Sequence, residues 1–193
     1  MPKRGSGVFR SALIVDIADR EAHRSNIAWS NLSVKTQGSS GKKEALEYLN
    51  TVSCYRLIVR NTWKKGCSWL TLRARTRLVG VDLAPIKGGI RTYLSGVSLD
   101  RAFLEATDFS NSTIQSGRFV QANLINTNWE NALLKGADLQ AAHLGSVRNL
   151  TCKQLKSAKN WEKTYRPEEL ACGAKIVSYR DIWKPNRIVG WSN

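Results

Sequence analysis

Acidic residues and long apolar runs are scarce in this sequence. Only 15 Asp and Glu residues oppose 30 Lys and Arg residues in a chain of 193, which gives a formal net charge of +15. This balance favours anionic partners such as phosphate backbones or acidic lipids. The longest early apolar run, Ala12 to Val15, is only four residues long and is followed by Asp16, whereas a membrane span needs about 20 apolar residues. We therefore expect neither a membrane-spanning helix nor a signal peptide, and expect a cytoplasmic protein that is able to associate peripherally with membranes.

Cysteine and histidine are also few, and none of them are spaced as metal ligands. The two histidines are His23 and His143, and no two cysteines have the close spacing of zinc ligands. We expect four free thiols in a reducing compartment (Cys54, Cys67, Cys152 and Cys172). No carboxylate pair, nucleophile–base set or phosphate loop with the required spacing is evident, so we expect no catalysis, no metal and no cofactor.

A repeat of five residues fills the middle of the chain. Apolar residues make up 42% of the sequence, enough for a core. Large apolar residues recur at every fifth position, and the residue two places before each is small or uncharged. The large residues are Leu94, Leu99, Leu104, Phe109, Ile114, Phe119, Leu124, Trp129, Leu134, Leu139 and Leu144.

A period of five fits neither an α-helix nor a flat strand. Five residues advance a helix by about 500°, so the large residues would spread around its surface. Five is an odd number, so successive members would alternate between the faces of a strand. A chain that bends once per repeat can bury them all on one side, and regular bending produces a solenoid.

The repeat resembles that of the pentapeptide-repeat family. The segments Ala122-Asn123-Leu124 and Ala137-Asp138-Leu139 match the family's A-(D/N)-L core, and Thr107-Asp108-Phe109 is a close variant. The resemblance implies a mainly β fold, a right-handed quadrilateral β-helix with four repeats per coil and flanking α-helices. Residues 20 apart would then stack, and eleven repeats would make about 2.75 coils. The expected columns are Leu94/Ile114/Leu134, Leu99/Phe119/Leu139, Leu104/Leu124/Leu144 and Phe109/Trp129.

Helical signals flank the repeats. We expect helices over residues 11–32 and 42–50, and a helix start at Thr151, where Gln154 completes a capping box. Leu83 suggests one more repeat, displaced by an insertion around residues 84–91. We thus expect four segments. They are an N-terminal helical segment (1–52), a basic connecting segment with a strand and one irregular repeat (53–91), the β-helix (92–147), and a C-terminal helical cap with a basic tail (148–193).

Basic residues before the repeats form a candidate anion site. In Leu72–Leu78 apolar or small residues alternate with arginines, which as a strand would place three arginines on one face. Such a face could hold phosphates, but it could equally be an edge strand protected by charge against aggregation, and we favour the second interpretation. The candidate anion-binding residues are Lys64, Lys65, Arg73, Arg75 and Arg77.

The expected function is that of a non-catalytic scaffold that binds another protein. The alternative is a binder of nucleic acid or of an anionic membrane surface through the basic flanks. The family resemblance also suggests a soluble bacterial protein, or a fragment without the membrane anchor that related proteins carry upstream. Some family members protect gyrase by imitating DNA, but this needs a strongly negative rod, and residues 81–150 carry equal numbers of acidic and basic side chains. Neither the partner nor the oligomeric state follows from the sequence.

Overall fold

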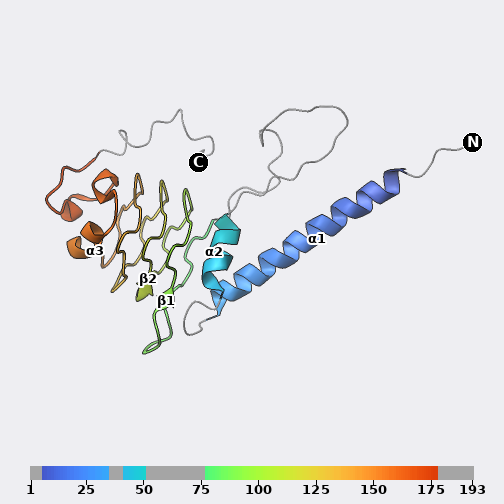
Figure 1. Ribbon diagram of the computed structural model, residues 1–193, viewed down its shortest axis with the longest axis horizontal. Coiled ribbons are helices and arrows are strands. Elements are labelled where there is room, and N and C mark those ends of the chain that lie inside the picture. Colours follow the sequence, from blue (N-terminus) through green and yellow to red (C-terminus); the bar gives the residue numbers. More distant parts are fainter. Residues whose placement is uncertain (1–5, 35–40, 51–76, 178–193) are drawn as a thin grey trace, which may run out of the picture.

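A computed structural model describes residues 6–34, 41–50 and 77–177 (Figure 1). A solenoid occupies the middle, with helices at both ends. The elements are α1 (Ser6–Ser33), α2 (Lys42–Asn50), β1 (Thr92–Tyr93), β2 (Ser112–Thr113), α3 (Cys152–Ser157) and the 3-10 helices η1 (Trp161–Lys163) and η2 (Glu168–Leu170). The expected helix at 42–50 is confirmed, and the expected helix at 11–32 is longer by several residues at its start.

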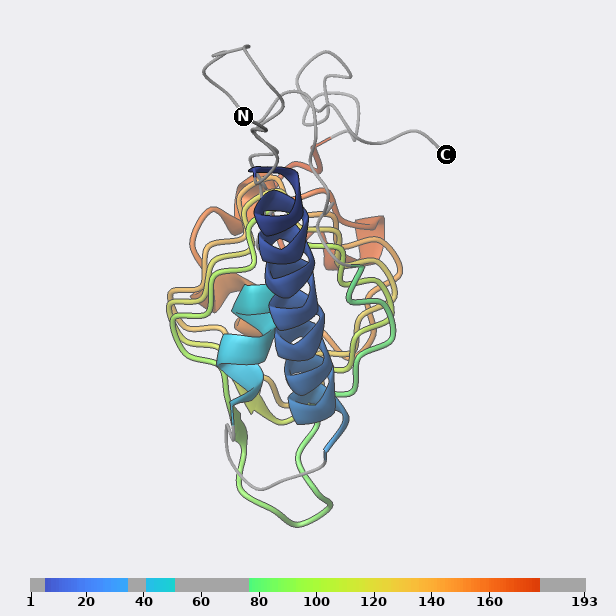
Figure 2. The same cartoon turned by 90° about the vertical axis from the view of Figure 1, so that its right-hand side faces the viewer.

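Parallel pairing between residues 20 apart stacks the coils of the solenoid. β1 pairs with β2, and single bridges join Ser98 to Arg118 and Arg118 to Asp138. Regular strands are only two residues long because the chain turns at every repeat. Figure 2 shows the coils stacked behind one another. The prediction of a β-helix-like solenoid with a register of 20 is thereby confirmed.

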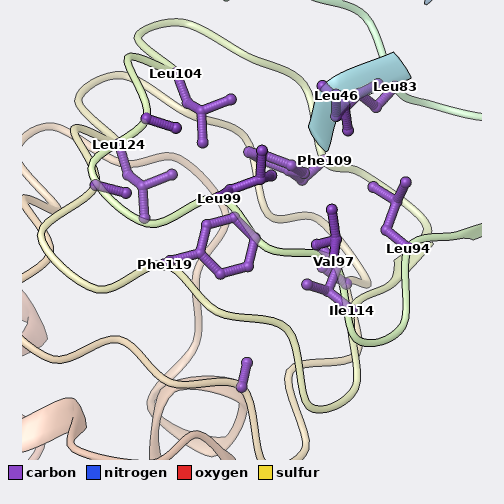
Figure 3. Packing of buried hydrophobic residues seen from close by; sticks show 14 of the residues in the cluster. Leu46, Leu83, Leu94, Val97, Leu99, Leu104, Phe109, Ile114, Phe119 and Leu124 are labelled. Atoms are coloured by element: carbon purple, nitrogen blue, oxygen red, sulfur yellow. The ribbon is translucent and has the colours of Figure 1, made fainter. Parts of the chain in front are cut away.

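The large apolar residues of the repeat fill the interior. All eleven are between 0 and 2% exposed (Figure 3). The Phe109 and Trp129 rings stack with their centroids 4.6 Å apart, and Phe119 meets Trp129 edge-on at 6.1 Å. This is the pairing of Phe109 with Trp129 that the family resemblance implies.

The corner of each repeat is a turn with a left-handed residue. The N–H of Ala102 donates to the carbonyl of Leu99, and the residue before Ala102, Arg101, has φ 57°. A positive φ at the third residue is the signature of a type II turn, where glycine is favoured. Only Gly96 and Gly136 supply it in the regular repeats. Nine non-glycine residues adopt it at the other corners: Arg101, Ala106, Asn111, Ser116, Gln121, Asn126, Asn131, Ala141 and Ser146.

An Asp or Asn precedes four of the eleven large residues, where it folds the chain locally and contacts the neighbouring coil or cap. The side chain of Asp108 accepts from the N–H of Ser110 at 2.8 Å, a turn that these two residue types favour. The same Asp108 oxygen accepts from the side-chain amide of Asn128, 20 residues on, at 3.1 Å. Asn128 in turn accepts from Asn149 at 2.9 Å. The A-(D/N)-L pattern thus encodes both a turn and a ladder between coils.

The ladder begins before residue 92. Arg77 pairs with Phe103 and Asp82 with Asp108, which is six residues more than the regular 20, and Leu78 and Leu83 are fully buried. The insertion expected around residues 84–91 absorbs these extra residues. Leu78 is therefore the large residue of a repeat, and its assignment to an alternating strand is wrong. Only Leu83 follows it before the insertion, so the period of five is too short there to be recognised.

Helix α2 covers the first coil. Leu46 and Leu49 are fully buried, and Figure 3 shows Leu46 beside Leu83. In the next coil the equivalent N–H, that of Arg118, donates to a backbone carbonyl of the coil before it. The N–H of Ser98 donates instead to Glu47 Oε1 at 2.8 Å. The side-chain amide of Asn50 donates to the carbonyl of Asp100 at 3.2 Å. Exposed coil ends, which the sequence leaves open to pairing, are here covered by the chain itself.

The small position of the repeat gives a test of core polarity. The Ser112 hydroxyl is buried without a hydrogen-bond partner, and Ala132 fills the same slot one coil later. An unpaired buried hydroxyl costs roughly 1–3 kcal/mol, so we expect Ser112→Ala to raise the free energy of unfolding by about 1 kcal/mol in a denaturant titration. Thr107→Ala is the control, because its hydroxyl donates to the Leu78 carbonyl at 2.9 Å. It should lower stability, and a loss of stability in Ser112→Ala would contradict the assignment.

Candidate interaction surfaces

Of the five predicted anion-binding residues, only Arg77 lies in the described part of the chain. Lys64, Lys65, Arg73 and Arg75 lie outside the described residues. Arg77 lies on the outside of the first coil, with its guanidinium 3.1 Å from a Glu105 carboxylate oxygen and 5.7 Å from the centroid of the Phe103 ring. Leu78 beside it is buried, so the expected alternation holds at this pair. The structure gives Arg77 an intramolecular ion pair.

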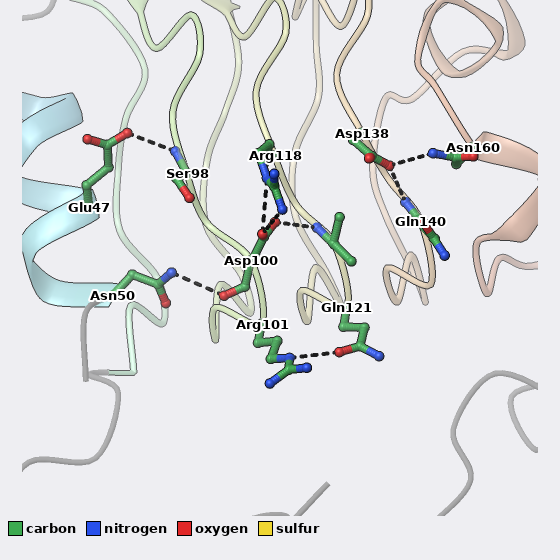
Figure 4. A network of polar contacts seen from close by, with 11 residues as sticks. Glu47, Asn50, Ser98, Asp100, Arg101, Arg118, Gln121, Asp138, Gln140 and Asn160 are labelled. Atoms are coloured by element: carbon green, nitrogen blue, oxygen red, sulfur yellow. Dashed lines mark hydrogen bonds and ion pairs between the residues drawn. The ribbon is translucent and has the colours of Figure 1, made fainter. Parts of the chain in front are cut away.

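One side of the solenoid carries an extended polar network (Figure 4). Arg118 donates to Asp100 at 2.6 Å, and Arg101 donates to Gln121 at 2.9 Å. The hydrogen bond and the charge of Asp100 raise the pKa of Arg118. Asp138 continues the network toward the C-terminal end by accepting from the side chain of Asn160 at 2.9 Å. These contacts fix the orientation of side chains that would otherwise be mobile on the surface.

His143 occupies the slot that Asp or Asn fills in other repeats. It is half-buried, its ring centroid lies 4.4 Å from that of Tyr165, and its Nδ1 accepts from the Gly145 N–H at 3.3 Å. Burial lowers its pKa, against smaller opposite effects from its backbone hydrogen bond and the Glu105 charge. An Nδ1 that accepts a hydrogen bond is unprotonated, and the lowered pKa favours the neutral imidazole, so we expect His143 to have a structural role.

His143 should make stability depend on pH. Because its pKa in the folded state is lower than in the unfolded state, its contribution is complete above about pH 6.5 and is lost as the pH falls through the folded-state pKa. We expect His143→Asn, which keeps an acceptor for the Gly145 N–H, to reduce the fall in Tm between about pH 7.5 and pH 5. Thermal melts by circular dichroism at several pH values measure this. An unchanged pH profile would contradict it.

The C-terminal cap is closed by a disulfide bond, which corrects the expectation of free thiols. Cys152 and Cys172 are joined with an S–S distance of 2.03 Å, across 20 residues of sequence. The bond does not follow from the sequence, because the two cysteines are too far apart to form a motif and only the fold brings α3 beside the segment after η2. Cys54 and Cys67 lie outside the described residues.

Gln154 links this cap to the last coil. Its Oε1 accepts from the Thr151 N–H at 2.8 Å, and its Nε2 donates to the carbonyls of Trp129 and Ala132 at 2.8 and 3.0 Å. The capping box expected at Thr151 is therefore confirmed. Gln154 supplies donors to carbonyls at the end of the stack, as Glu47 supplies an acceptor at the start.

An inserted loop and a small hollow complete the exposed features. The loop at 84–91 protrudes beyond the coils near β1 and carries Ile86 and Ile90, 42% and 55% exposed (Figures 1 and 2). A hollow of about 240 Å³ lies between α1 and α2, lined by residues that include Arg24, Asn31 and Tyr48. Among the residues that the structure describes, no helix is long and apolar enough to cross a bilayer, and no three potential metal ligands cluster.

Comparison with known proteins agrees with the geometry of the stack. The family model described as pentapeptide repeats matches residues 90–124 and 118–148, with eight copies of the repeat. A search of curated proteins gives no match. The matched residues are those in which bridges recur every 20 positions and the large residues are buried. Residues 90–148 are therefore repeats of the pentapeptide-repeat family, and they form the regular part of the solenoid of this chain.

Proposed function

We propose that the chain is a non-catalytic scaffold, a right-handed quadrilateral β-helix whose sides bind a partner protein. The observation that carries the proposal is that the chain covers both ends of the solenoid and leaves the sides exposed. Glu47 and Asn50 satisfy backbone groups of the first coil, and Gln154 satisfies those of the last. Rigid side surfaces with side chains already fixed lose little entropy on binding.

Site-specific crosslinking tests this proposal. A photoreactive amino acid would replace Gln115, Glu130 or Gln140, which are exposed on different sides of the solenoid, with exposed Glu44 on α2 as the end control. In the native cell, at least one side position should capture a discrete protein that survives a high-salt wash, and Glu44 should not. Absence of a product from every side position, or capture only from Glu44, would overturn the proposal.

A second candidate is a binder of polyanions through the basic flanks. It is favoured by four exposed lysines on the C-terminal cap: Lys153, Lys156, Lys159 and Lys163. Binding of this kind weakens steeply with added salt. Retention on heparin that is lost at moderate salt, without a salt-resistant protein partner, would favour it over the scaffold. Imitation of DNA is not proposed, because Arg101, Arg118 and Lys135 place positive charge on the sides of the solenoid.

The compartment in which the protein acts is also a proposal. The Cys152–Cys172 bond supports an oxidising compartment rather than the cytoplasm that the sequence analysis expects. Treating native cells with a thiol-alkylating reagent before lysis tests this. A Cys152 that is unreactive until a reductant is added supports the oxidising compartment, and a Cys152 alkylated without reductant supports the cytoplasm.

A further inference from the structure

The loop at residues 84–91 is an ordered projection and not a loose connection. At its base, Thr92 Oγ1 donates to the Leu83 carbonyl at 2.7 Å, which brings the two ends of the insertion together. Arg91 donates to the Asn131 carbonyl at 2.6 Å and fixes the base against a later coil. The loop therefore projects from the solenoid in a defined direction.

The tip of the loop is a tight turn. The Gly89 N–H donates to the Ile86 carbonyl at 2.7 Å, and Gly88 has φ 77°, as a type II turn requires. A Cβ atom on Gly89 would lie 2.8 Å from the Ile86 carbonyl oxygen, so only glycine fits there. The turn keeps Ile86 and Ile90 on the two arms of the loop, with Lys87 between them.

The exposed side chains of the loop and its base are apolar, basic or aromatic. Ile86 and Ile90 are 42% and 55% exposed, and exposed Lys87 lies at the tip. Tyr93, just beyond the base, is 49% exposed. Residues 84–91 contain no acidic side chain, and the whole chain carries +15. Apolar residues, an interfacial aromatic ring and a lysine able to extend its ammonium to phosphates are the components of a segment that lies in a membrane interface.

We propose that this loop docks the protein on an anionic lipid surface, a role beyond that of scaffold. Ile86 and Ile90 enter the boundary between headgroups and acyl chains, Tyr93 lies at headgroup level, and Lys87 contacts lipid phosphates. A convex apolar projection without a groove suits a soft lipid surface better than the flat face of another protein. One loop of this size binds a membrane only weakly by itself. The remaining positive charge of the chain strengthens the binding by long-range attraction to the anionic surface.

Vesicle binding by the full chain tests the proposal. The vesicles would be phosphatidylcholine with or without about 30% phosphatidylglycerol, at low salt, with co-sedimentation as the readout. The unmodified chain should bind the anionic vesicles only. The double variant Ile86→Ser/Ile90→Ser should lose at least about tenfold in affinity, and Lys87→Gln should lose less. An unchanged Tm for each variant shows that the exposed loop does not carry the fold.

Val79→Ser is the matched control, because Val79 is 46% exposed elsewhere on the solenoid. Its binding should equal that of the unmodified chain. The proposal is overturned if the unmodified chain ignores anionic vesicles, if the double variant binds as well as Val79→Ser, or if the loop substitutions instead abolish capture of a partner protein while vesicle binding persists. These outcomes do not depend on crosslinking from the sides of the solenoid.

Discussion

Trp129→Ala should destabilise the protein by about 3–5 kcal/mol, a large part of the roughly 5–15 kcal/mol that stabilises an ordinary domain. Trp129 is 1% exposed, stacks on Phe109, and meets Phe119 edge-on. Removal of the indole leaves a cavity inside a narrow solenoid. The neighbouring coils are held apart by backbone hydrogen bonds and cannot move in to fill the cavity. Denaturant unfolding followed by circular dichroism measures the effect.

Trp129→Phe separates the loss of the stack from the loss of the indole N–H. The ring still stacks on Phe109, but the hydrogen bond from Nε1 to Thr127 Oγ1, at 2.7 Å, is lost. Because the Thr127 hydroxyl still donates to the Leu124 carbonyl, no buried donor remains unpaired, and we expect a loss of about 1–2 kcal/mol. Trp29→Ala is the control, since Trp29 is 39% exposed on α1. Equal stability of Trp129→Ala and Trp29→Ala would contradict the role of Trp129 in the core.

Arg166→Met should open the C-terminal cap and cost roughly 3 kcal/mol, because a buried carbonyl that is left without a donor costs about 1–3 kcal/mol. Arg166 is 1% exposed, yet its guanidinium faces backbone carbonyls and not a carboxylate. Burial lowers its pKa, but an arginine remains charged at neutral pH. The carbonyl partners within 3.5 Å are those of Trp161, Glu162, Thr164, Leu170, Ala171, Ala174 and Lys175.

Methionine fills similar volume but leaves these carbonyls without donors. The segment from η1 to Lys175 should then lose its order first, because one side chain joins carbonyls along its whole length. Limited proteolysis should cut between α3 and Cys172, and the Cys152–Cys172 bond should hold the two fragments together until it is reduced. Lys163→Met removes the same charge from an exposed position and should leave the cap resistant. Equal proteolysis of the two variants would refute the role of Arg166.

The sequence by itself determined the solenoid and much of its interior. A strict period of five admits neither helix nor flat strand and so predicts a solenoid, and the resemblance to the pentapeptide-repeat family adds the register of 20 and the Phe109–Trp129 stack. The helix at 42–50 and the capping box at Thr151 were equally accessible, since a helix start depends on residues three apart. The ladder of Asp and Asn side chains is also local in origin. Each of these residues makes a turn with the residue two places on, and this turn places its side chain beside the side chain of the next coil.

Only the tertiary structure decided how the solenoid ends and which surfaces remain. The Cys152–Cys172 bond, the carbonyls around Arg166 and the contact of Glu47 with Ser98 join residues brought together by the path of the chain, and no spacing encodes them. The insertion at 84–91 was visible as a break in the period, but its defined projection depends on Thr92 and Arg91 reaching backbone carbonyls across the coil. A repeat specifies its neighbours through periodicity, whereas caps and insertions are single features whose partners are set by three-dimensional proximity.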